Sequence, residues 1–226
     1  MKQLLNGKVL DMLTVPSGVV AAVLTDITED DKLVVEYRLI SAETGEVQRV
    51  SKNVFMLAKF GPNHKVAEMQ IKNHLTCKSA ILDNGKTLIS EDDGSAKLLN
   101  AEGIDEEWVG KIKYKDEAPT ALCYDGKNVW AAFTDNDTLV RLDANSLTEE
   151  LRIGGKSGDN NFRGPDGIFA ENEFIYVCNK ISQTVWKINT KNFSAEEYLK
   201  IETPIFGFAR IAENCIFWLS DGIYQI

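Results

Sequence analysis

The sequence is poor in histidine: its 226 residues include only His64 and His74, and both lie in the first third of the chain. A Ser-His-Asp or Cys-His catalytic system needs a histidine base within reach of its nucleophile. Because no histidine follows residue 74, most of the chain lacks the base that such a system requires. The sequence therefore argues against an enzyme of the triad type.

Cysteines and long apolar stretches are also scarce. The four cysteines are Cys77, Cys123, Cys178 and Cys215, and no two of them have the CxxC spacing of a redox or zinc motif. Isolated cysteines within apolar segments predict buried free thiols in a reducing compartment. No run of 18 apolar residues could span a membrane, and the N-terminus lacks the apolar segment of a signal peptide. These features favour a cytoplasmic protein with no membrane partner.

Positive charge is in the minority, with 25 Lys and Arg against 34 Asp and Glu, which gives a net charge of −9. An acidic protein repels phosphate backbones, so we expect no nucleic-acid partner. The hydrophobic fraction of 44% and the charged fraction of 26% are ordinary for a globular domain. We expect a monomer with one domain over residues 1–226.

What the sequence does contain is a repeated unit, which recurs at residues 79–112, 119–153 and 165–201. In the middle copy, Asp125-Gly126-Lys127 is a hairpin signal, and Asp135-Asn136-Asp137 ends the apolar run that follows it. Val140-Arg141-Leu142 then alternates apolar and polar residues, as a strand with one solvated face does. A polar segment at 149–153 completes the unit, which therefore predicts four short strands.

The spacing of the third-strand triplet indicates the architecture. The triplet recurs at intervals of 44, 46 and 38 residues, as Ala96-Lys97-Leu98, Val140-Arg141-Leu142, Trp186-Lys187-Ile188 and Tyr224-Gln225-Ile226. Four-stranded units that repeat about every 40–45 residues are typical of β-propeller blades. We predict an all-β fold, a β-propeller of five four-stranded blades, with six blades as the alternative.

Residues 1–75 fit the repeat less well, and two registers remain open. In one, residues 8–50 form a full blade and Val54 to Ile71 is an extra hairpin; in the other, residues 32–72 form the blade. Both treat 54–60 and 66–71 as strands and leave almost no helix. The last repeat, Pro204 to Ile226, stops after its third strand. We therefore expect an N-terminal strand to close the C-terminal blade.

Residues 76–226 resemble the NHL-repeat, streptogramin-lyase and gluconolactonase-like propellers, on the pattern of Pro, apolar strand, Asp-Gly, aromatic strand, then VRLD or WKIN. The resemblance implies that Asp166 in Pro165-Asp166-Gly167 is a divalent-metal ligand near the central channel. The equivalent positions hold Thr120, Ile205 and Ser79, which are poor ligands for a hard cation. A lyase of this type also implies a late histidine, which is missing. We expect no cofactor, with a divalent cation in the channel as the alternative.

Acidic turns between the second and third strands should gather on one face of such a ring, interrupted by Lys156, Arg163 and Lys180. A face of this kind attracts a basic partner or a cation. We predict a non-enzymatic propeller that binds a protein or small molecule, basic in character, on the loop face around the channel. The alternative is a metal-dependent hydrolase or lyase. The candidate ligand-binding residues are Asp92, Asp135, Arg163, Asp166, Asn179 and Asp221. Trp130, Tyr176, Trp186 and Phe217 are expected to pack between blades.

Overall fold

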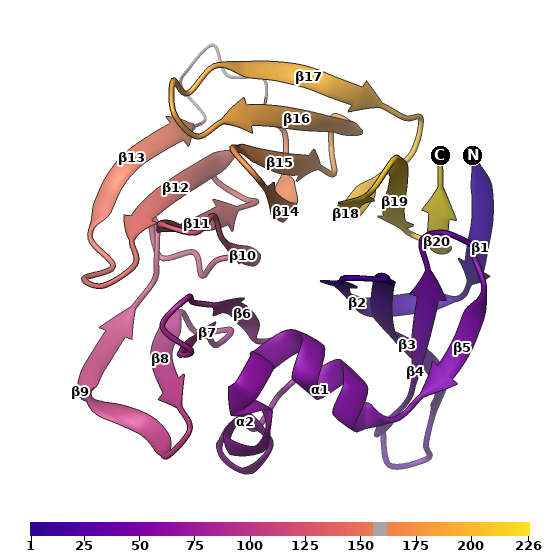
Figure 1. The fold of residues 1–226 in the computed structure, drawn as a ribbon, viewed down its shortest axis with the longest axis horizontal. Coiled ribbons are helices and arrows are strands. Elements are labelled where there is room, and N and C mark those ends of the chain that lie inside the picture. The colour runs from indigo at the N-terminus through magenta and orange to yellow at the C-terminus, as the bar shows by residue number, and fades with distance from the viewer. Residues whose placement is uncertain (156–161) are drawn as a thin grey trace.

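A computed structural model describes residues 1–155 and 162–226, except for the side chains of residues 107–109. The described residues form five antiparallel sheets of four strands each, arranged in a ring (Figure 1). The chain is a five-bladed β-propeller, as the triplet spacing predicts. In four blades the strands follow chain order from the centre of the ring outward. The C-terminal blade differs only in that its outermost strand comes from the N-terminus.

The first two blades come from the N-terminal half. Their strands are β2 (Lys8–Val15), β3 (Gly18–Ile27), β4 (Leu33–Ser41) and β5 (Val47–Val50), then β6 (Lys78–Ile81), β7 (Thr87–Ser90), β8 (Ser95–Asn100) and β9 (Gly103–Lys111).

The other blades follow the repeat closely. Their strands are β10 (Ala121–Tyr124), β11 (Asn128–Phe133), β12 (Thr138–Asp143) and β13 (Glu149–Gly154), then β14 (Pro165–Glu171), β15 (Phe174–Asn179), β16 (Thr184–Asn189) and β17 (Ala195–Lys200), and finally β18 (Ile205–Ile211), β19 (Asn214–Leu219) and β20 (Gly222–Gln225).

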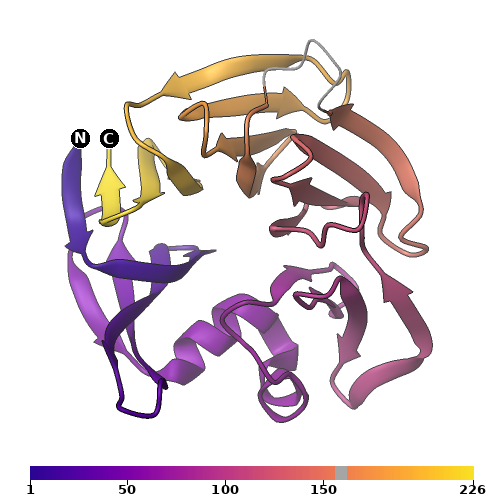
Figure 2. The ribbon, with the colours of Figure 1, turned by 180° about the vertical axis from the view of Figure 1, so that it is seen from behind.

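Strand β1 (Lys2–Asn6) closes the ring. It pairs antiparallel with β20, from Lys2 opposite Gln225 to Asn6 opposite Gly222. The two chain ends therefore lie side by side, in Figure 1 and again from behind in Figure 2. Backbone approach is close here, since a Cβ on Gly222 would lie 1.9 Å from the carbonyl oxygen of Leu5. The prediction of an N-terminal strand in the last blade is confirmed.

The helices between the first two blades correct the sequence prediction. Residues 54–60 and 66–71 are not strands: α1 (Lys52–Phe60), a 3-10 turn η1 (Gly61–Asn63) and α2 (His64–Gln70) occupy this segment. In α1 the buried residues are Phe55, Met56, Lys59 and Phe60, which is the spacing of one helical face. Residues 8–50 form the full blade, so the first register is confirmed, and the extra hairpin and the second register are wrong.

Aromatic residues fill the spaces between blades. Trp130, Tyr176 and Phe217 are fully buried, as predicted. Trp186 also packs between blades 3 and 4, against the cluster that contains Trp130 and Val177, but it is only partly buried and meets Phe162 edge-on with ring centroids 6.3 Å apart. Blades 4 and 5 share a dense aromatic cluster, in which the ring centroids of Tyr176 and Phe208 lie 5.2 Å apart.

All four cysteines carry free thiols. Cys77 and Cys178 are buried, and Cys123 and Cys215 are partly buried. Burial raises the pKa of the Cys178 thiol, which keeps it protonated and unreactive. No helix in the described part of the chain is long and apolar enough to cross a membrane.

Candidate functional site

The turns between the second and third strands gather at one end of the ring. Antiparallel strand order places these turns at the same end as the loops that enter each innermost strand. We call this set of turns and entry loops the rim. Its turns lie at residues 28–32, 91–94, 134–137, 180–183 and 220–221. Lys156, which was expected to interrupt the acidic face, lies outside the described residues.

Asp92 and Asp135 are exposed on the rim. The carboxylate of Asp92 accepts a hydrogen bond of 2.6 Å from the Thr76 hydroxyl in the loop entering β6. The backbone amide of Asp135 donates to Glu117 at 2.8 Å, and Glu117 also accepts the side-chain amide of Asn136 at 2.7 Å. Entry loops are therefore tied to the acidic turns, while the Asp135 carboxylate remains at the surface.

Asp221 and Arg163 are also exposed, but Asn179 is not. Asp221 accepts a 2.8 Å hydrogen bond from the Tyr224 hydroxyl. The Asn179 side chain is fully buried, accepts the Arg163 backbone amide at 3.1 Å and donates to the Val177 carbonyl at 3.2 Å. Asn179 thus fixes the entry loop of blade 4, and its side chain offers no surface to a partner.

Asp166 is the predicted site residue that faces the channel. It is half-buried, and its Oδ1 lies 3.2 Å from the Thr134 hydroxyl, which also donates to the Pro165 carbonyl at 2.7 Å. Burial raises the pKa of the Asp166 carboxyl, and the nearby Lys180 ammonium opposes that shift. The protonated form is therefore more favoured at Asp166 than it is for an exposed aspartate.

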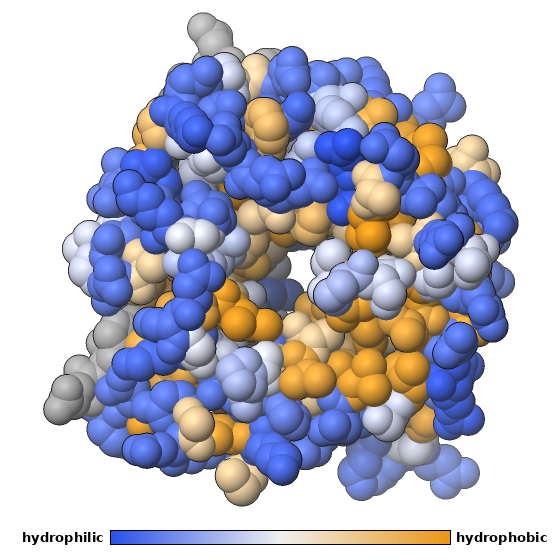
Figure 3. Space-filling model, in the orientation of Figure 1, coloured by the Kyte–Doolittle hydropathy of each residue, from blue (hydrophilic) through white to orange (hydrophobic). Residues whose placement is uncertain are grey.

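The central channel contains a cavity of about 210 Å³ that is lined by the innermost strands of all five blades. Figure 3 shows the opening at the middle of the ring, with hydrophobic surface beside it. Ser79, Thr120 and Asp166, three of the four positions singled out by the resemblance, line this cavity. Ile205, the fourth, is fully buried, and Phe206 lines the channel in its place.

The channel also contains an ion pair that the sequence alone does not predict. The ammonium of Lys59 lies 2.6 Å from the carboxylate of Asp11, although the two residues are 48 positions apart. Lys59 sits at the C-terminal end of α1, where the Ser79 hydroxyl donates to its carbonyl at 2.7 Å. Asp11 lies at a bulge in β2. The one sequence signal for this ion pair was the position of Asp11, an acidic residue inside an otherwise apolar strand.

The channel does not fit a divalent-metal site. Asp11 and Asp166 are the carboxylates in its lining, and Asp11 is already paired with Lys59. Across the described residues, no three His, Cys, Asp or Glu side chains are grouped closely enough to hold a metal ion. The residues present therefore lack the set of oxygen ligands that Ca²⁺ or Mg²⁺ needs.

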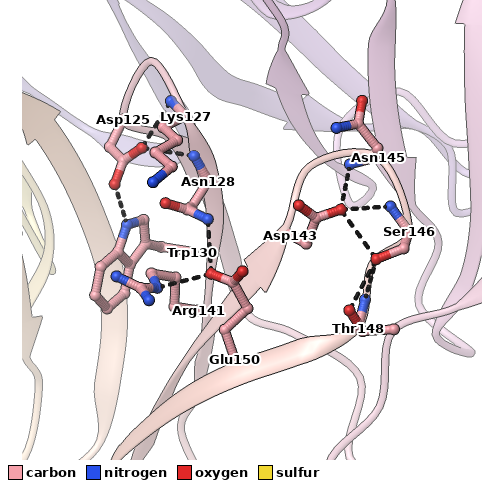
Figure 4. Close-up of polar contacts among 10 residues, drawn as sticks. All are labelled: Asp125, Lys127, Asn128, Trp130, Arg141, Asp143, Asn145, Ser146, Thr148 and Glu150. Carbon is pink, nitrogen blue, oxygen red and sulfur yellow. Dashed lines mark hydrogen bonds and ion pairs between the residues drawn. The ribbon is translucent and has the colours of Figure 1, made fainter.

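A second polar network braces blade 3 at the end of the ring opposite the rim (Figure 4). The indole N–H of Trp130 donates to Asp125 at 2.7 Å, and the Asn128 amide donates to Glu150 at 2.9 Å. Arg141 lies 3.2 Å from the same Glu150 carboxylate. These contacts join the turn after β10 to strands β11, β12 and β13 and satisfy a buried tryptophan, so we assign this network to stability.

No family model matches the sequence, and no curated protein matches it. Among solved structures, the WD40 β-propeller domain of Doa1 is similar with a TM-score of 0.54 and 12% identity, over 96% of this chain and 62% of that one. The computationally designed Ika4 protein gives 0.52 and 9% identity, over 70% and 94%. The designed Ika8 protein gives 0.52 and 11%, over 96% and 58%.

The chain thus spans about three fifths of the Doa1 and Ika8 chains. At identities this low, the likeness extends to the fold alone. It agrees with the ring of blades described above, and the chemistry of the site has to be argued from this chain's own residues.

Proposed function

We propose that this protein is a non-enzymatic binding propeller, and that its rim contacts a partner with a basic surface. The observation that carries the proposal is the exposure of Asp92, Asp135 and Asp221 on turns from three different blades at one end of the ring. Such an arrangement presents a negative field over a broad surface, which steers a positively charged partner toward it. We also propose a monomer in the cytoplasm.

The remaining predicted residues have graded roles in this proposal. Arg163 is exposed beside the acidic turns, and its positive charge would repel basic groups of the partner at that point. Asp166 lies deeper, at the channel, and Asn179 acts only by holding the Arg163 loop. The kinship with NHL-repeat, streptogramin-lyase and gluconolactonase-like propellers remains a proposal that rests on the Pro165-Asp166-Gly167 motif and the repeat.

The test is a charge-reversal series against a defined basic probe, a lysine-rich peptide. Asp92→Lys together with Asp135→Lys should lower the association rate with little change in dissociation, because rim charges act mainly on encounter. Binding should also weaken as salt rises and the Debye length falls to about 8 Å. Glu43→Lys together with Glu102→Lys, two exposed residues in turns at the opposite end of the ring, is the matched control. Equal effects from the rim and control variants would refute the proposal.

The alternative is a metal-dependent hydrolase or lyase. The channel lacks a divalent-metal ligand set, but Asp166 combines a channel position with a raised pKa, as groups at catalytic sites often do. Calorimetric titration with Ca²⁺ and Mg²⁺, combined with a lactonase and esterase screen, separates the two functions. Stoichiometric metal binding with turnover that Asp166→Ala abolishes would establish the enzyme. Absence of both would leave the binding function.

A further inference from the structure

The channel lining lacks the acidic excess of the rest of the protein. The chain as a whole carries −9, yet the cavity is lined by Lys59 and Lys78 as well as by Asp11 and Asp166. Lys180 lies close to the same cavity, with its ammonium 4.8 Å from the ring centre of Phe206, one of the lining residues. Two lysines and two aspartates therefore line the channel, and Lys180 adds a third ammonium close to it.

Lys59 is the most constrained of these groups, with only 3% of its side chain exposed. Its ammonium donates to Asp11 at 2.6 Å and to the Leu75 carbonyl at 3.4 Å. The ammonium also lies 5.7 Å from the ring centroid of Phe55, so an aromatic face covers it as well. Lys59 therefore places a fixed positive charge in the lining of the cavity.

Lys78 adds a second cation on the adjoining strand β6. It lines the same cavity and forms no ion pair with any described residue. If the Lys59–Asp11 pair served only to anchor helix α1, that role would explain this pair. It would not explain a second lysine, without an ion pair among the described residues, in the lining of the same cavity, and it is this second residue that points to a ligand.

The other side of the cavity is aromatic. Phe206 and Trp218 both line it, with ring centroids 5.7 Å apart and planes tilted by 31°. The volume of about 210 Å³ is below the roughly 300–1,000 Å³ of sites for drug-sized ligands. The cavity therefore suits a small molecule with one charged end and one flat apolar end.

We propose that the channel binds a small aromatic carboxylic acid, whose carboxylate lies between the ammonium groups of Lys59 and Lys78 and whose ring packs against Phe206 and Trp218. The anion gives Lys78 the ion-pair partner that it lacks among the described residues. This site is separate from the acidic rim, and it does not depend on the rim binding a partner.

The experiment compares three probes of similar shape by calorimetry on the full chain: benzoate, benzyl alcohol and benzylamine. Benzoate should bind with one-to-one stoichiometry, at least tenfold more tightly than the neutral alcohol, and benzylamine should not bind. The indole N–H signal of Trp218, identified by its loss in Trp218→Phe, should shift on addition of benzoate. Equal affinity for benzoate and benzyl alcohol, preference for benzylamine, or an unchanged Trp218 signal would each overturn the proposal.

Variants locate the charge that is responsible. Lys78→Met should weaken benzoate binding about tenfold or more, since hydrogen bonds to charged groups contribute that much. Lys127→Met, at an exposed lysine outside the channel, should leave the affinity unchanged. Asp166→Asn removes a negative charge without removing the contact to Thr134 and should strengthen binding; weaker binding in that variant would contradict the proposal.

Discussion

Ring closure by β1 can be tested with a single methyl group. Gly222 has φ of +153°, and a Cβ at this residue would lie 1.9 Å from the Leu5 carbonyl oxygen and 3.2 Å from the Asn6 Cα. Because both contacts are to backbone, no side-chain rotation can relieve them. Gly222→Ala should therefore push β1 away from β20 without shortening the chain.

The magnitude follows from what β1 contributes. Four residue pairs join β1 to β20, and each ladder hydrogen bond contributes about 0.5–1.5 kcal/mol. Leu4 and Leu5 are half-buried against the cluster between blades 5 and 1, and each adds roughly half of the 1.5–3 kcal/mol of a fully buried leucine. The whole strand is thus worth roughly 4–9 kcal/mol, a large part of the 5–15 kcal/mol typical of a domain. We expect Gly222→Ala to lose several kcal/mol.

The control is Gly85→Ala. Gly85 has φ of +78°, and a Cβ there would meet nothing within 4 Å, so this variant carries backbone strain without a clash. Its cost should be about 1–2 kcal/mol. Urea denaturation of both variants measures the difference. A chain that lacks residues 1–6 should also be stabilised by a synthetic peptide of residues 1–7. Equal losses for the two alanine variants, together with no effect of the peptide, would refute closure by β1.

Two further predictions follow from burial. Trp130→Ala should cost about 3–5 kcal/mol in unfolding free energy, because it empties a fully buried site, whereas Trp186→Ala should cost clearly less, because Trp186 is partly exposed; equal losses in chemical denaturation would count against this packing. The raised pKa of Asp166 means that the folded state binds this proton more tightly than the unfolded state, so its ionisation lowers stability as pH rises above about 4. Asp166→Asn should therefore stabilise the protein at neutral pH and flatten that dependence, and an unchanged pH profile of the unfolding free energy would show that burial does not govern this group.

The regular blades were predictable because their signals are local. Asp125-Gly126-Lys127 and Asp135-Asn136-Asp137 mark turns by their own side chains, and the recurring third-strand triplet gives the period without tertiary information. Asp125 and Asp143 indeed accept backbone amides within their turns in the structure. The strands of blades 3 and 4 could therefore be predicted from the chain alone.

The helical segment was not predictable by the same rules. Residues 54–60 form an apolar run, which a strand and a buried helix share, and no acidic residue marks the first turn of α1. A helix and a strand differ in which of these residues are buried, and burial depends on the blades that pack against the segment. The Lys59–Asp11 pair was missed for this reason, since its prediction requires both the helix and the register of β2.

Helices α1 and α2 change how the first two blades meet. Elsewhere sheets pack directly on sheets, but here Phe55, Met56 and Phe60 lie between the faces of blades 1 and 2, in a core shared with Val20 and Ile89. Helix α1 contacts β2, β3, β4 and β6, so it fills the wedge where the innermost strands would otherwise converge.

Two cavities in the described part of the chain border this wedge. The channel takes Lys59 from α1, and a second cavity of about 370 Å³ lies between the segment that follows α2, at residues 70–73, and the acidic turn at 91–93. Departures from a local sequence rule tend to mark functional positions, because a repeat that serves only stability has no reason to be interrupted. The helical wedge brings a buried ammonium to the channel, beside Lys78 at the start of β6. We therefore expect the substitutions that weaken ligand binding to concentrate at Lys59 and Lys78, next to the wedge, rather than in the regular blade 3.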